Sequence, residues 1–199
     1  MRRFERLRRE IWNLPNMITV GRVFLIPPVV FLMDKTDPVK CLAASLIFVV
    51  ASLLDAVDGW LARKQGLVTV FGKFVDPLAD KIMVCVLLVY LVADGRAPAW
   101  MVVLLLSREF YIGGLRSLAS VEGVVIPASS GGKLKTIIQL AGISFLLIHF
   151  SYRLPGTTFA LDFHLVGIAL VSASLFASVW SAINYTVSFG GALGQRQGE

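Results

Sequence analysis

The chain has little charge: 16% of its 199 residues are charged, 56% are hydrophobic, and its mean hydropathy is +0.76. Soluble domains carry about 25% charged residues, so this composition excludes an ordinary soluble protein and favours a polytopic membrane protein. The sequence also lacks the alternating ten-residue segments of outer-membrane barrels. A bundle of membrane helices is therefore the expected fold class.

Cysteine and histidine are scarce, with two of each. Cys41 and Cys85 lie in apolar runs, which predicts buried thiols rather than a disulfide. His149 and His164 fall near the outer ends of apolar segments, and neither has a metal-ligand partner near it in sequence. We therefore expect both to be interfacial or packing residues. The scarcity of both residue types argues against zinc.

The net charge of +6 fits anionic lipid or a phosphorylated substrate. It does not predict nucleic-acid binding, because no soluble basic domain remains outside the apolar runs. No cleavable signal peptide is expected, since the first ten residues, MRRFERLRRE, carry charge and no small-residue cleavage site follows. Residues 1–14 instead predict an amphipathic helix on the membrane surface, with Phe4, Leu7, Ile11 and Trp12 on one stripe.

Six apolar segments, separated by turn residues, are long enough to be membrane helices. They are residues 15–33, 41–63, 73–93, 97–118, 132–151 and 162–188. Arginine and lysine concentrate at the N-terminus and around the second and fourth connections. The positive-inside rule therefore predicts a multi-pass membrane protein with both termini in the cytoplasm.

Four aspartates interrupt the second and third segments, in LLDAVDGWLARKQGLVTVFGKFVDPLADK. Asp55 and Asp58 share one helix face, and Asp76 and Asp80 share one face of the next helix. The loop near Leu67 makes the two segments antiparallel. Asp58 and Asp76 each lie about nine residues from it, so the 1.5 Å rise per residue brings the carboxylates to matching depths.

Four carboxylates this close cannot all stay ionised unless cations lie among them. Oxygen ligands suit Mg²⁺ or Mn²⁺, as one ion or as a pair about 4 Å apart. Gly59 and Gly72 leave room beside the carboxylates for a phosphorylated ligand. The aspartates could also form a buried salt network with Arg63, Lys73 and Lys81, or serve as the ion relay of a cation transporter.

The pattern D-x2-D-G-x2-A-R-x8-G-x3-D-x3-D resembles the signature of the CDP-alcohol phosphotransferase family without a departure. Its fixed positions are Asp55, Asp58, Gly59, Ala62, Arg63, Gly72, Asp76 and Asp80. That family also has six membrane helices, so the resemblance covers nearly the whole chain. It implies a reaction in which a CDP-linked lipid gives its phosphatidyl group to an alcohol and CMP is released.

The resemblance also implies a role for each residue. Asp55, Asp58 and Asp76 are expected to hold the metal ions, and Asp80 is expected to be the general base and a further metal ligand. The residues expected to contact the CDP-lipid are Gly59, Ala62, Arg63 and Gly72, together with Thr19 and Arg22 of the first segment.

The stretches NLPNMITVGR, SREFYIGGLR and GGKLKTIIQ resemble the bacterial branch of that family that forms phosphatidylglycerophosphate from CDP-diacylglycerol and glycerol 3-phosphate. A phosphorylated acceptor needs cations, which Arg108, Arg116, Lys133 and Lys135 supply. The same four residues also satisfy the positive-inside rule, so a purely topological role stays open. Glu109 is expected to be an ion-pair partner rather than a catalyst.

We therefore predict an all-α integral membrane enzyme: an interfacial helix (1–14), a six-helix membrane domain (15–190) and a cytoplasmic tail (191–199). The resemblance to the bacterial branch implies that the enzyme lies in the bacterial inner membrane, with its active site on the cytoplasmic side. Serines of the last segment fit either a homodimer seam or packing within the bundle. They are Ser172, Ser174, Ser178 and Ser181. A sister enzyme using inositol phosphate, serine or phosphatidylglycerol is the nearest alternative, and a cation transporter is the alternative of a different class.

Overall fold

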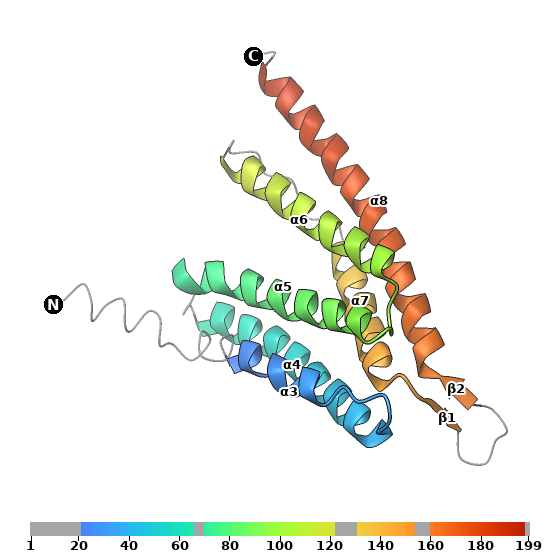
Figure 1. The fold of residues 1–199 in the computed structure, drawn as a ribbon. Helices are drawn as coiled ribbons and strands as arrows, with labels where there is room; N and C mark the ends of the chain where they lie inside the picture. The colour runs from blue at the N-terminus through green and yellow to red at the C-terminus, as the bar shows by residue number, and fades with distance from the viewer. Residues whose placement is uncertain (1–20, 66–69, 122–130, 154–159, 198–199) are drawn as a thin grey trace.

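The computed structural model describes residues 21–65, 70–121, 131–153 and 160–197, and this part of the chain is mostly helical (Figure 1). Its elements are α3 (Ile26–Phe31), α4 (Pro38–Gln65), α5 (Val70–Ala93), α6 (Ala99–Val121), α7 (Gly131–Ile148), β1 (Ser151–Arg153), β2 (Ala160–Asp162) and α8 (Phe163–Gln197). Each of the six predicted apolar segments overlaps one of the six helices, so the approximate positions of the helices are confirmed. The predicted surface helix of residues 1–14 lies outside the described residues.

Length and apolar composition single out one helix in the described part of the chain as able to cross a membrane, Phe163–Ala192 within α8. The other apolar stretches are shorter: Gly21–Phe31, Pro38–Leu54, Lys81–Ala93 and Leu134–Ile148. Large apolar side chains face outward, such as Phe176 and Trp180 on α8. A mostly helical, membrane-type architecture is thus supported, with the short pair β1–β2 as an addition to the predicted all-α fold, while six crossings stay a prediction.

Local signals in the sequence explain where several helices begin. Asp37 precedes α4, and its Oδ1 accepts hydrogen bonds from the backbone N–H of Val39 and Lys40 at 2.9 and 3.2 Å. Asp162 does the same for α8 by accepting from Leu165 N–H at 3.0 Å. These carboxylates satisfy amide groups that have no partner inside the helix.

Of the described helix pairs, α7 and α8 pack together most extensively, and glycines make this approach possible. A Cβ added at Gly142 would lie 2.7 Å from Val171 Cγ2, and one at Gly167 would lie 2.8 Å from Leu146 Cγ. Ser174, completely buried in α8, donates its hydroxyl to Val171 O at 2.8 Å. Small residues therefore pack these two helices together, in agreement with the packing alternative for the serines.

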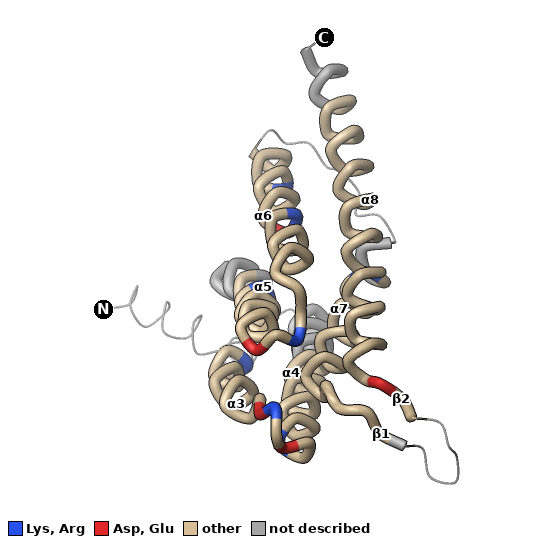
Figure 2. The backbone as a smooth tube through the Cα atoms, turned by 45° about the vertical axis from the view of Figure 1, so that its right-hand side comes forward, with Lys and Arg blue, Asp and Glu red and all other residues tan. Residues whose placement is uncertain are grey.

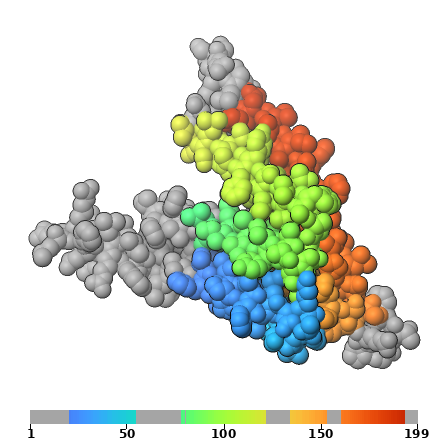
Figure 3. Space-filling model, in the orientation of Figure 1, coloured from blue at the N-terminus to red at the C-terminus, as the bar shows by residue number. Residues whose placement is uncertain are grey.

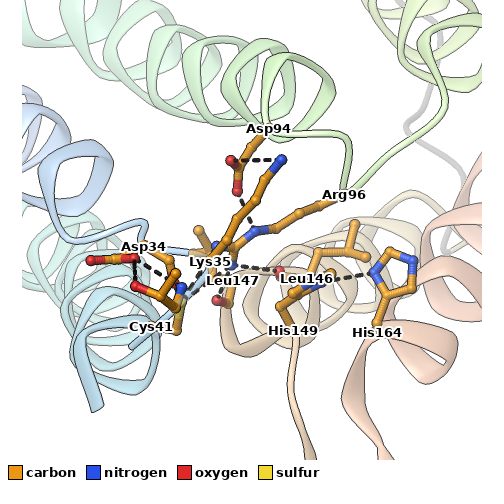
Figure 4. A network of polar contacts seen from close by, with 10 residues as sticks. Asp34, Lys35, Cys41, Asp94, Arg96, Leu146, Leu147, His149 and His164 are labelled. Carbon is orange, nitrogen blue, oxygen red and sulfur yellow. Dashed lines mark hydrogen bonds and ion pairs between the residues drawn. The ribbon is translucent and has the colours of Figure 1, made fainter. Parts of the chain in front are cut away.

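The loops at one end of the bundle meet around Arg96, whose side chain is completely buried (Figure 4). Its guanidinium pairs with Asp94 beyond the end of α5, contacts Cys41 Sγ near the start of α4, and donates to Leu147 O near the end of α7 at 2.7 Å. Lys35 reaches the same Asp94 at 3.5 Å. Both cysteines are free thiols, as predicted, with Cys41 buried and Cys85 partly buried.

The histidines lie at this same end, where they contact each other, which the sequence did not predict. His149 and His164 have their Nδ1 atoms 3.1 Å apart (Figure 4). They meet because the antiparallel pair β1–β2 turns the chain from α7 back into α8. Burial and the nearby charge of Arg96 lower the pKa of His149. No helix-period pattern predicted this short hairpin, since its strands have only three residues each.

Surface charges near this end are held by local contacts. Hydrogen bonds from Thr36 and Lys40 hold the pKa of the Asp34 carboxyl well below its ordinary range. In turn, the contact with Asp34 raises the pKa of Lys40. Charged residues thus gather at the loops that join α3 to α4 and α5 to α6, which can be followed in Figure 2. We call this end of the bundle the loop end.

Candidate active site

The contacts of Arg96 fix which helix termini share the loop end, and therefore which termini share the opposite end. The loop end holds the start of α4, the end of α5 and the end of α7. The opposite end therefore holds the end of α4, the start of α5, the end of α6 and the start of α7. These are the helix portions that carry the predicted site residues.

The predicted metal ligands lie on helices, as expected. Asp55 and Asp58 are in the second half of α4, and Asp76 and Asp80 are in the first half of α5. Because both stretches are helical, each pair keeps the spacing that puts its members on one helix face. Their side chains, and those of Gly59 to Gly72, lie outside the described residues, so their convergence stays a prediction.

The first segment also contributes to this end. Arg22 lies at the start of the stretch Gly21–Phe31, and its side chain is buried, with 3% exposed. Helix α3, which follows it, packs against both α4 and α5. Arg22 therefore starts the segment that packs on the two aspartate-bearing helices. Thr19, predicted beside it, lies outside the described residues.

Two of the predicted acceptor-site residues converge on one carboxylate. Glu109 Oε2 accepts from Lys135 Nζ at 3.0 Å and from Arg108 Nη1 at 3.1 Å. Arg108 also donates through Nε to Ser178 O of α8 at 2.9 Å. The two cationic side chains are only 7% and 10% exposed, whereas that of Glu109 is 40% exposed. Arg108 and Glu109 of α6, Lys135 of α7 and the Ser178 carbonyl of α8 thus form one basic cluster. The sequence predicted its cations and an ion-pair role for Glu109, but not that both cations meet on that carboxylate.

Arg116 lies apart from this contact. Its guanidinium carbon is 5.8 Å from the centre of the Tyr185 ring on α8, which is within cation–π range. The side chain of Lys133 lies outside the described residues. The hydroxyl of Ser178 is buried and has no hydrogen-bond partner in the described part of the chain. The wall formed by α6 and α8 therefore carries both positive charge and unused hydrogen-bonding capacity.

The sequence assigned Lys81 only to a possible salt network, yet this lysine reaches the neighbourhood of the basic cluster. Its Nζ would lie 3.0 Å from a Cβ added at Gly113 on α6. The signal that could have revealed it is the adjacency of Asp80 and Lys81 at the end of the aspartate pattern. The space-filling view shows that the end of α6 stands apart from α5 at the end of the bundle opposite the loop end (Figure 3).

Comparison with known proteins agrees with the aspartate pattern. Residues 12–187 match the CDP-alcohol phosphatidyltransferase family, and the chain belongs to this family. The match covers most of the chain and ends within α8.

Individual relatives narrow the comparison. The chain is 41% identical over 192 residues to a CDP-diacylglycerol–glycerol-3-phosphate 3-phosphatidyltransferase of Bacillus subtilis, covering 90% of this chain and 92% of the relative. It is 36% identical to a probable phosphatidylglycerophosphate synthase of Mycobacterium tuberculosis, covering 89% and 82%. It is 30% identical to a CMP-forming cardiolipin synthase of rice, covering 88% of this chain and 57% of the relative.

Proposed function

We propose that this protein transfers the phosphatidyl group of CDP-diacylglycerol to sn-glycerol 3-phosphate, giving phosphatidylglycerophosphate and CMP. The observation that carries the choice of acceptor is the basic cluster, in which the buried Lys135 and the largely buried Arg108 lie at the same end of the bundle as the aspartate-bearing helices. Buried cations of this kind suit a phosphorylated acceptor. The name of the 41% identical relative agrees with this choice.

The donor set of α4 and α5 fits hard divalent cations, because it consists of four carboxylates on helical faces. Asp55, Asp58 and Asp76 would hold Mg²⁺ or Mn²⁺, with Asp80 as a further ligand. Ions bound there would neutralise the CDP pyrophosphate and the charge that develops on the departing CMP. Gly59, Ala62, Arg63 and Gly72, with Thr19 and Arg22, would contact the CDP-lipid.

The proposed transfer is a direct in-line displacement. Asp80 removes the proton from an acceptor hydroxyl, and the hydroxyl oxygen forms a bond to the phosphatidyl phosphorus. The bond from that phosphorus to the oxygen of CMP breaks, so no covalent enzyme intermediate is needed. Arg108 and Lys135, with Arg116 and Lys133, bind the acceptor's phosphate and hold its hydroxyl in line.

We further propose that all six helices cross the membrane, with residues 1–14 on its inner surface and both termini and the active site in the cytoplasm. The excess of lysine and arginine on that side supports this orientation. Residues 15–190 then form the membrane domain, residues 191–199 form the tail, and two copies of the chain form a homodimer.

The test is an acceptor screen with purified protein, CDP-diacylglycerol and Mg²⁺, in which CMP release is measured. Glycerol 3-phosphate is expected to support turnover, while inositol phosphate, serine and phosphatidylglycerol are not. Turnover with phosphatidylglycerol alone would instead identify that lipid as the acceptor. Cation flux in liposomes without CMP release under any acceptor would identify a transporter and refute the proposal.

A further inference from the structure

Glu109 differs from the other residues of the basic cluster, because it is the acidic group on which two cations meet. A single oxygen, Oε2, accepts from Lys135 of α7 and from Arg108 of α6. Arg108 is also fixed by the backbone carbonyl of Ser178 on α8. Within the described part of the chain, the Lys135 ammonium donates to no other side chain or carbonyl, so its position depends on Glu109.

Electrostatics explains why this arrangement needs the carboxylate. Two positive groups that share one oxygen partner lie close together and are largely removed from water, where like charges repel more strongly than in solution. A lysine side chain is also flexible along its four-carbon stem. Without Glu109, the Lys135 ammonium would be free to turn away from Arg108.

We propose that Glu109 is a positioning residue that holds Lys135 and Arg108 together as a preformed receptor for the phosphate of the acceptor. This inference rests on the proposed function and assigns Glu109 no contact with the reacting atoms. Both cations retain further N–H donors for the phosphate, because an ammonium and a guanidinium carry more donors than these contacts use. The carboxylate thus organises the site before the acceptor arrives, and the two cations bind the acceptor.

The variant Glu109→Gln tests this role, because it keeps the shape of the side chain and removes its charge. We expect the KM for glycerol 3-phosphate to rise about tenfold or more, as loss of a hydrogen bond to a charged group predicts. The kcat and the KM for CDP-diacylglycerol should stay within about twofold, since transition-state contacts are not removed. Glu109→Asp, which retains the charge, should recover part of the acceptor affinity.

Asp162→Asn is a matched control, because it also removes one carboxylate charge but lies at the loop end. It should leave both KM values unchanged. A double-mutant cycle with Lys135→Gln then asks whether Glu109 acts through the lysine. If it does, adding Glu109→Gln to Lys135→Gln raises the acceptor KM little further.

Three results would overturn the inference. The first is an unchanged or lower acceptor KM in Glu109→Gln, which would make the carboxylate a bystander or a competitor of the phosphate. The second is an acceptor KM in the double variant that rises by the product of the two single-variant increases, which would mean that Glu109 and Lys135 act independently. The third is loss of folded protein in both Glu109→Gln and Glu109→Asp, which would assign Glu109 a purely structural role.

The wild-type enzyme separates this inference from the proposed function. If it ignores glycerol 3-phosphate but uses another phosphorylated alcohol, the proposed acceptor is wrong, and the Glu109 variants are measured with that alcohol by the same criteria. If it releases CMP only with acceptors that carry no phosphate, both the acceptor and the role of Glu109 are refuted.

Discussion

Replacement of the buried Arg96 by methionine should destabilise the protein strongly while leaving its chemistry intact. The side chain is completely buried and joins the start of α4, the end of α5 and the end of α7. Methionine keeps much of the apolar stem but none of the donors. The change leaves Leu147 O without its 2.7 Å partner, and among the described residues it leaves Asp94 paired only with the more distant Lys35.

The expected cost follows from these contacts. Breaking a buried ion pair by removing one partner costs about 3–5 kcal/mol, and a hydrogen bond to a charged group contributes about 1.5–3 kcal/mol within that range. We therefore expect a loss of about 3–5 kcal/mol, which corresponds to roughly 10 °C in Tm for a chain of this size. Lys35→Met is the matched control: Lys35 reaches the same Asp94, but its side chain is 57% exposed, so it should cost about 1 kcal/mol or less.

The assay is thermal unfolding of the purified protein in one detergent, followed by CMP release measured well below both unfolding temperatures. Arg96→Met should show the large Tm decrease with near wild-type turnover, because Arg96 lies at the end of the bundle away from the α4 and α5 residues that carry the aspartates. Equal Tm values for Arg96→Met and Lys35→Met would refute the assigned energetic role of the buried guanidinium. Loss of turnover in folded Arg96→Met would refute the separation of the two ends.

The remaining predictions concern chemistry and pH. Asp80→Asn should lose CMP release by several orders of magnitude while still binding CDP-diacylglycerol, measured by lipid-binding titration; retained turnover would exclude Asp80 as the base. Arg108→Ala should raise the KM for glycerol 3-phosphate much more than that for CDP-diacylglycerol, and equal effects would indicate a structural role. Burial, Arg96 and His164 lower the pKa of His149 below its ordinary 6.5, so the unfolded chain binds the proton first as pH falls. The stability that neutral His149 contributes is complete above about pH 7 and is lost as pH falls from 6.5 through its folded pKa. Tm should therefore decrease between pH 7.5 and 5.5, and less so in His149→Asn, which tolerates the φ of 63° at this position.

The sequence predicted those features that depend on local order along the chain. Apolar runs of membrane length predicted the positions of the helices. A segment that crosses lipid must pair its own backbone polar groups, and a helix does this. The spacing of Arg108 and Lys135 from their helix ends placed both at one end of the bundle, and the structure adds that they meet on Glu109. Predictions of this kind need only the helical rise and the order of the segments.

Features that depend on tertiary approach were not predictable in the same way. In the sequence, Arg96 is an ordinary loop residue on the predicted outer side of the membrane. In the structure, packing buries its side chain completely. The meeting of His149 with His164 depends on a hairpin whose strands are too short to show an alternating pattern. The close packing of α7 against α8 likewise depends on Gly142 and Gly167. Nothing in the sequence around these glycines shows that they face another helix.

The two ends of the bundle therefore use charge for different purposes. At the loop end, Arg96 has its hydrogen-bonding groups paired with protein atoms, which stabilises the fold and leaves little capacity for a ligand. At the other end, Arg108 and Lys135 share one half-exposed carboxylate, so the positive charge exceeds the negative charge in that contact. A buried excess of positive charge is unfavourable unless an anion completes it. A phosphorylated acceptor should therefore raise the Tm of the wild-type protein more than that of Lys135→Gln, whereas Arg96→Met should keep the full ligand-dependent increase from its lower starting value.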